Sequence, residues 1–79
     1  MLDEIALRDF IAEITLQKKE EIGADTPLLS SGLIDSVRLL ELVTFIEKKS
    51  GVKIRPGDMG LRNFDSISRI LSFLASRRR

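Results

Sequence analysis

Apolar residues recur at helical spacing in three segments of the chain. In a helix with one buried face, apolar positions fall at i, i+3, i+4 and i+7. This pattern predicts a first helix over residues 3–17, a second from Asp35-Ser36 to about Ser50, and a third that begins at Asp65 or Ser66. The residues expected to face the core are, in chain order, Leu7, Phe10, Ile11, Ile14, Leu39, Leu42, Val43, Ile46, Ile67, Ile70, Leu71 and Leu74.

The connection between the first two helices, residues 20–34, is long for so small a chain. Gly23, Pro27 and Gly32 mark it as irregular. Scattered apolar residues indicate that it is nevertheless pinned to the core. These residues are Ile22, Leu28, Leu29 and Leu33.

The segment between the second and third helices is shorter and also irregular. Gly51 ends the second helix, residues 52–55 form a short extended link, and a single helical turn is expected near residues 58–61. Together the elements predict an all-α fold. It is a small four-helix bundle of three main helices and one short helix, with a long first loop, in a single domain spanning residues 1–79.

Composition removes most routes to catalysis. The 79 residues include no cysteine and no histidine, which excludes zinc catalysis, a Cys/His nucleophile pair and a Ser-His-Asp triad. Carboxylates remain for a two-acid hydrolase, but a chain this short has little room to enclose a pocket. We therefore expect no enzyme activity and no metal site. Because no apolar run is long enough to span a membrane and the N-terminus does not resemble a signal peptide, we expect a cytoplasmic protein without membrane insertion.

Charge is distributed unevenly along the chain. Residues 1–35 carry a net charge of −5, residues 36–79 carry +6, and the chain ends in Arg77-Arg78-Arg79. Such a basic half raises the possibility of a nucleic-acid-associated protein. Against this, the chain has no tryptophan or tyrosine, and its four phenylalanines lie within apolar stretches. We expect no nucleic-acid partner and an arginine tail that is solvated and frayed.

The Asp35-Ser36 pair at the start of the second helix is the candidate for chemistry. Asp35 is placed to cap the helix, and Ser36 then occupies the first helical position, where the partial positive charge favours a phosphate ester on its hydroxyl. The dipeptide alone also has an ordinary explanation as a capping pair. A second pair, Asp65-Ser66, is interpreted as a plain cap, because no glycine closely precedes it and no long loop leads to it.

Some apolar residues of the second helix fall outside its core stripe. At about 100° per residue, Leu40 and Val37 project to the side of the helix that carries Ser36, with Glu41 and Thr44 nearby. Exposed apolar groups next to a modification site favour a docking face for partner proteins, although single exposed leucines are also common on ordinary surfaces.

Three stretches of the sequence resemble the acyl carrier protein family. Residues 25–36, from Asp25-Thr26-Pro27 to Ile34-Asp35-Ser36, are similar to the family's first loop and its Asp-Ser pair. Residues 39–43, with the acidic Glu41, are similar to its recognition helix, and residues 63–67 to the entry of its last helix. The resemblance covers nearly the whole chain, and the order and spacing of these stretches are more specific than any single motif.

The resemblance implies a function that composition does not. A phosphopantetheinyl transferase would attach a 4'-phosphopantetheine arm from coenzyme A to the Ser36 hydroxyl, next to Asp35. Acyl- or aminoacyl-loading enzymes and later enzymes of fatty acid, polyketide or nonribosomal peptide biosynthesis would use thioesters on that arm. The chain would act as a monomeric carrier. Its partner-docking residues would be Val37, Arg38, Leu40, Glu41 and Thr44.

The sequence departs from the family in its charge. Many carriers are strongly acidic, whereas here Arg38 follows the serine and the second half of the chain is basic. The form Gly-Leu-Ile-Asp-Ser, residues 32–36, is more similar to stand-alone carriers used in amino-acid activation, such as D-alanyl or aminoacyl carriers. An unmodified helical protein-interaction module is the alternative function.

Overall fold

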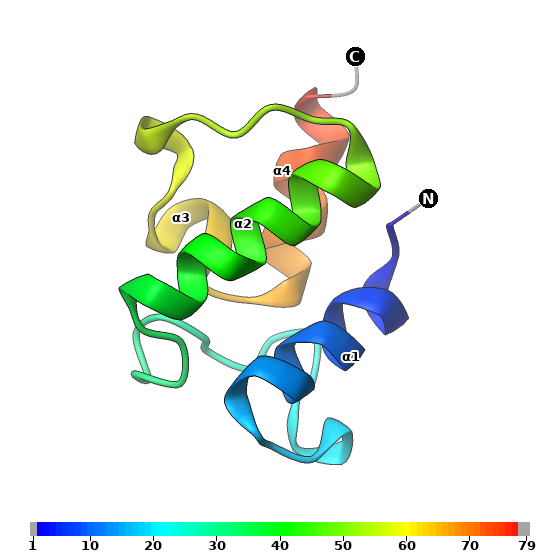
Figure 1. Cartoon of the computed structure of the whole chain (residues 1–79), viewed down its shortest axis with the longest axis vertical. Coiled ribbons are helices and arrows are strands. Elements are labelled where there is room, and N and C mark those ends of the chain that lie inside the picture. The colour runs from blue at the N-terminus through cyan, green and yellow to red at the C-terminus, as the bar shows by residue number, and fades with distance from the viewer. Residues whose placement is uncertain (1, 78–79) are drawn as a thin grey trace.

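The computed structural model describes residues 2–77, and these residues form an all-helical bundle without a β-strand (Figure 1). The helices are α1 (Glu4–Thr15), α2 (Ser36–Ser50), α3 (Leu61–Phe64) and α4 (Ile67–Arg77), with 3-10 turns at Lys19–Glu21 and Pro56–Asp58. In Figure 1, α2 crosses the front of the molecule and the long first loop passes below its N-terminal end. The prediction of three main helices, one short helix and a long first loop is confirmed.

One apolar core is shared by the helices and the loops. The buried side chains of α1, α2 and α4 meet buried residues of the connecting segments. Ile22, Leu28 and Ile34 from the first loop and Ile54 from the link are all buried, while Leu29 and Leu33 pack against the core in part. The loop is therefore held to the bundle by its own side chains, as its scattered apolar residues predict.

The first helix is shorter than predicted. It ends at Thr15 instead of continuing to residue 17, because Leu16 adopts the left-handed conformation with φ of 59°. This conformation costs a residue with a Cβ roughly 1–2 kcal/mol and is usually taken by glycine. Leu16 is 93% exposed, so its side chain contributes little to the core, and no glycine in the sequence marks this end.

The segment between α2 and α4 differs from the single helical turn expected near residues 58–61. Pro56–Asp58 forms a 3-10 turn, and Leu61–Phe64 forms the one-turn helix α3. Gly51 ends α2 in the left-handed conformation, with φ of 74°, and its amide donates to the Glu47 carbonyl. The buried ring of Phe64 fixes the position of α3 against α4.

The inner face of α4 is rotated relative to the prediction. Ile67, Ile70 and Leu74 are buried as expected, but Phe73 is buried in addition and Leu71 is only half-buried. Phe73 packs on Phe64, with 5.7 Å between ring centroids. Leu71 and Phe73 flank the core stripe of α4 on opposite sides. Phe73 is the one that becomes buried, because it packs against the Phe64 ring of α3.

The arginine tail was expected to be solvated and frayed; Arg77 is exposed, but it is held at the end of α4 and is not frayed. Its guanidinium lies 4.9 Å from the centroid of the Phe73 ring and pairs with the Asp58 carboxylate at 2.5 Å. These contacts join the end of α4 to the turn before α3. Residues 78 and 79 lie outside the described part of the chain.

Candidate functional site

The N-terminal end of α2 presents an exposed serine. Asp35 precedes the helix in an extended conformation, and its Oδ1 accepts a hydrogen bond from the Arg38 amide at 2.8 Å. The Asp35 carbonyl accepts from the Leu39 amide, also at 2.8 Å. Ser36 is the first residue of the helix and is exposed. The predicted cap and the predicted helix start are therefore both confirmed.

This end of the helix suits a phosphate ester. The first four amides of a helix have no intrahelical carbonyl to bond, and Asp35 satisfies those of Arg38 and Leu39. The amides of Ser36 and Val37 are left at the open end of the helix dipole, where an anionic group is favoured. The exposed Ser36 hydroxyl thus has room for a substituent and donors suited to its phosphate.

The loop before α2 is held by a residue that sequence reasoning assigned a different role. The pair Asp65-Ser66 was interpreted as a plain helix cap; Ser66 does cap α4, but the Asp65 carboxylate bonds the first loop instead. Its Oδ1 accepts hydrogen bonds from the amides of Leu28 (3.2 Å), Leu29 (2.8 Å) and Ser30 (2.8 Å), while its Oδ2 accepts from the Ser30 hydroxyl at 2.8 Å. The hydrogen bonds from Ser30 and then those from the other two amides lower the pKa of Asp65.

The loop closes on itself just before the helix. The Ile34 amide donates to the Leu28 carbonyl at 2.9 Å, and the Ser31 hydroxyl donates to the Pro27 carbonyl at 2.7 Å. Gly32, at the exposed tip, has φ of 81°, a left-handed conformation that other residues rarely adopt. The glycine before the Asp-Ser pair therefore serves a tight turn, and the closing hydrogen bond lies one residue before Asp35.

The two Asp-Ser pairs have different environments. Ser66 is only 6% exposed, and its Oγ accepts a hydrogen bond from the Arg69 amide at 3.1 Å, as expected of a residue that caps α4. Ser36 is exposed at the helix end. An enzyme can therefore reach the Ser36 hydroxyl without unfolding the chain, whereas the Ser66 hydroxyl is enclosed and already engaged.

The outward face of α2 carries the apolar residues that the helical projection placed there. Val37 and Leu40 are 61% and 59% exposed. Between them Arg38 pairs with Glu41 at 2.5 Å, and this hydrogen bond, with the charge of Glu41, raises the pKa of the Arg38 guanidinium. The negative charge of Glu41 on this face is therefore compensated by the positive charge of Arg38.

Thr44 continues this face toward α1. It is exposed, its hydroxyl donates to the Leu40 carbonyl at 3.0 Å, and with Glu41 it lines a shallow hollow of about 390 Å³. The floor of the hollow includes Phe10 of α1 and Phe45 of α2, whose rings stack with centroids 4.1 Å apart. The structure thus brings all five predicted docking residues onto exposed positions of the first three turns of α2.

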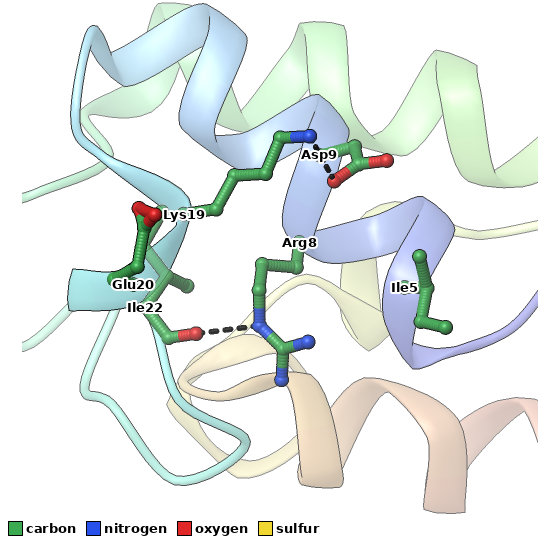
Figure 2. Close-up of a pocket in the computed structure, with 6 residues that line it drawn as sticks. All are labelled: Ile5, Arg8, Asp9, Lys19, Glu20 and Ile22. Atoms are coloured by element: carbon green, nitrogen blue, oxygen red, sulfur yellow. Dashed lines mark hydrogen bonds and ion pairs between the residues drawn. The ribbon is translucent and has the colours of Figure 1, made fainter.

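A larger hollow, of about 530 Å³, lies between α1 and the turn at residues 19–21, away from the α2 N-terminus (Figure 2). Its polar groups make structural contacts. The Arg8 Nε donates to the Ile22 carbonyl at 2.7 Å, and the Lys19 Nζ lies 3.3 Å from the Asp9 carboxylate. Arg8 also pairs with Glu4 along α1. These contacts attach the start of the long loop to α1.

Among residues 2–77 no group of acidic side chains is arranged to hold a metal ion. No helix in this range combines the length and apolar character that crossing a membrane requires.

Comparison with known proteins identifies the family. A family model described as a phosphopantetheine attachment site matches residues 6–74. The chain therefore belongs to the phosphopantetheine-binding family, in which the acyl carrier proteins are found, and the prosthetic group of this family is covalently attached 4'-phosphopantetheine. It is a carrier fold of the kind that the sequence resemblance implied. No curated protein matches the chain.

Solved structures support the same fold. One similar chain belongs to a structure titled "Crystal structure of FAD-dependent dehydrogenase" and has a TM-score of 0.76. It is 25% identical, and the match covers 86% of this chain and 97% of the other. Since residues 2–77 contain no β-strand, the likeness concerns the helical carrier fold.

Proposed function

We propose that this chain is an acyl or aminoacyl carrier protein and that its 4'-phosphopantetheine arm is attached to Ser36. The observation that carries the proposal is the exposed Ser36 hydroxyl at the open end of α2. The family match supports the carrier role, and the enclosed hydroxyl of Ser66 supports the choice between the two serines.

In the attachment reaction the Ser36 hydroxyl is the nucleophile. Its oxygen bonds to the phosphorus next to the pantetheine portion of coenzyme A, the phosphoanhydride bond breaks, and adenosine 3',5'-bisphosphate leaves. The hydroxyl proton passes to a base of the transferase. The amides of Ser36 and Val37 would hold the phosphate of the attached arm. The attached arm supplies a terminal thiol on which acyl or aminoacyl groups are carried as thioesters.

The chain's own task is presentation and partner choice, without catalysis of its own. A face made of Val37, Arg38, Leu40, Glu41 and Thr44 docks the transferase and the loading enzymes. The exposed side chains of Val37 and Leu40 supply apolar surface that a partner can bury. The Arg38–Glu41 pair adds one positive and one negative charge, so that the pair has no net charge. This face differs from the strongly acidic one of many carriers, which argues against enzymes with a basic docking patch. The form Gly-Leu-Ile-Asp-Ser, residues 32–36, favours partners of amino-acid activation.

The setting follows from this role. As a cytoplasmic, monomeric carrier of a single domain, the chain would meet its partner enzymes by diffusion. Neither nucleic acid nor membrane insertion forms part of the proposal. Phe64 and Phe73 are buried, and the half-buried rings of Phe10 and Phe45 stack on each other, which leaves no row of free rings for base stacking among residues 2–77.

Intact-mass measurement after incubation with coenzyme A and a broad-specificity transferase tests the proposal. We expect addition of one phosphopantetheinyl group to the parent and to Ser66→Ala, and none to Ser36→Ala. Peptide mapping of the modified parent should place the group on Ser36. A group on Ser66 would refute the site, and an unmodified but folded parent would favour the helical interaction module instead.

A further inference from the structure

The carboxylate of Asp65 is used in a way that neither the helical fold nor the Ser36 site requires. It follows α3 in the chain, yet its two oxygens bond residues 35 to 37 positions earlier. Three consecutive amides, of Leu28, Leu29 and Ser30, converge on Oδ1. The Asp65 carbonyl adds a further bond from the Leu28 amide at 2.8 Å. One residue thereby fixes the backbone of the loop that leads to Ser36.

A continuous path of hydrogen bonds runs from Asp65 to the attachment site. The Leu28 amide is held by Asp65, and the Leu28 carbonyl accepts from the Ile34 amide at 2.9 Å. Ile34 is followed directly by the cap residue Asp35 and then by Ser36. The side chains of Leu28 and Ile34 are both buried, so this path is also anchored in the core.

We propose that Asp65 is a positioning residue for the modification of Ser36, because it holds the preceding loop in the one shape that the transferase recognises together with the serine. This inference rests on the proposed function. It adds to that function a residue 29 positions after Ser36 that touches neither the serine nor coenzyme A and acts through the loop.

The size of an enzyme footprint makes the loop part of the recognised surface. A residue spans at most about 3.6 Å of chain, so the exposed tip at Gly32 lies within roughly 14 Å of Ser36. An interface of about 800 Å² on the carrier corresponds to a disc of roughly 16 Å radius. A transferase centred on Ser36 therefore also covers the exposed tip of the loop at Gly32.

Loss of the Asp65 contacts should affect recognition more than chemistry. Without them the loop samples several shapes, and apparent affinity falls in proportion to the fraction of molecules in the competent shape. If that fraction falls to about a tenth, the KM of the transferase for the carrier rises about tenfold. The kcat should stay within about twofold, because Asp35 still caps α2 and Ser36 keeps its place at the helix end.

Asp58 provides a matched control within the same chain. Its Oδ2 accepts from the Arg55 amide at 2.9 Å, and its Oδ1 pairs with Arg77 at 2.5 Å. It is thus another aspartate that bonds a backbone amide and is less than fully exposed, but its partners lie in the turn before α3 and at the end of α4. A purely structural effect of losing an aspartate should appear in Asp58→Ala as well.

The experiment measures initial rates of transfer from coenzyme A by a broad-specificity transferase, over a range of carrier concentrations. It compares the parent, Asp65→Ala, Asp65→Asn and Asp58→Ala at a temperature where circular dichroism shows each variant folded. Amide hydrogen exchange of Leu29 and Ser30 is followed in parallel. We expect Asp65→Ala to raise the KM about tenfold and to accelerate exchange of both amides. Asp65→Asn, which keeps one oxygen for the amides, should raise the KM less, by about threefold, and Asp58→Ala should leave it within about twofold.

The inference is overturned if folded Asp65→Ala has the KM of the parent or of Asp58→Ala, or if its kcat falls while its KM is unchanged. Where Asp65→Ala does not fold, the KM of the transferase for Asp65→Asn is compared with that for the parent. An Asp65→Asn variant with the KM of the parent overturns the inference. Failure of the proposed function looks different, because the parent itself would then remain unmodified or be modified at a residue other than Ser36.

Discussion

Two leucines of α2, two residues apart, give a sharp test of which face of this helix is core and which is surface. Leu42 is fully buried with 0% exposure, while Leu40 is 59% exposed. The same substitution at both positions removes the same atoms from the same helix. Leu42→Ala deletes buried methyl groups and leaves a cavity, which typically costs about 2–5 kcal/mol of unfolding free energy. Leu40→Ala should stay within about 0.5 kcal/mol of the parent, as for ordinary surface changes.

The cost at Leu42 is large relative to the stability of so small a protein. At about 0.05–0.15 kcal/mol per residue, 79 residues give a total of roughly 4–12 kcal/mol. A domain of this size loses about 4–8 °C in Tm per kcal/mol. Leu42→Ala should therefore lower the Tm by at least roughly 8 °C and can unfold a marginal chain outright, while Leu40→Ala should change it by less than about 4 °C.

Thermal unfolding followed by far-UV circular dichroism measures both variants under identical conditions. With Leu42 in the core and Leu40 on the surface, the Tm of Leu42→Ala should lie clearly below that of Leu40→Ala. Equal losses at both positions, or a larger loss for Leu40→Ala, would refute the assignment of Leu40 to the surface and with it the docking face.

Further predictions concern the α2 face, the cap and the loop anchor. Leu40→Ala, although stable, should lower kcat/KM for the natural loading enzyme or for the transferase by about tenfold or more, as when an interface anchor is truncated, and parental rates would leave the docking face without support. Arg38→Glu removes the partner of Glu41 and should change the association rate and its salt dependence more than the melting temperature, as stopped-flow binding at several salt concentrations would reveal. Asp35→Ala should cost about 1 kcal/mol as a lost cap and slow modification; an unchanged modification rate would assign Asp35 a structural role alone. The lowered pKa of Asp65 means that its contacts stabilise the fold fully above the unfolded pKa of about 3.9 and lose this effect as the pH falls through the lower folded-state pKa. The stability difference between the parent and Asp65→Asn, from urea unfolding, should therefore shrink between about pH 7 and about pH 3, and a constant difference would contradict this reasoning.

The sequence was informative wherever a local signal determines the outcome. Asp35 and Gly51 define the two ends of α2 because a side-chain cap and a left-handed glycine each act within a few residues. The core stripe of α2 and the exposure of Leu40 follow from helical periodicity alone. The cap placed Ser36 at the start of the helix, and the resemblance of residues 25–36 to the acyl carrier protein family made it the candidate attachment serine.

The errors arose where a disfavoured backbone conformation or a distant residue decides. The end of α1 depends on Leu16 accepting a conformation that its side chain disfavours. The burial of Phe73 depends on Phe64 of another helix. The role of Asp65 depends on three amides more than 30 residues away, and an Asp-Ser pair before a helix gives no local sign that its carboxylate turns to a different segment.

The contact between Asp65 and the first loop also has a consequence for the order of events during synthesis. Ser36 is made 29 residues before Asp65, which at about 5–20 residues per second is roughly 1.5–6 s earlier. Until Asp65 and α4 are made, the loop beside the serine lacks its anchor, and Ile67, Ile70 and Leu74 have not yet joined the core. A transferase that recognises the serine and the loop together therefore meets the ordered loop only after Asp65 has been synthesised.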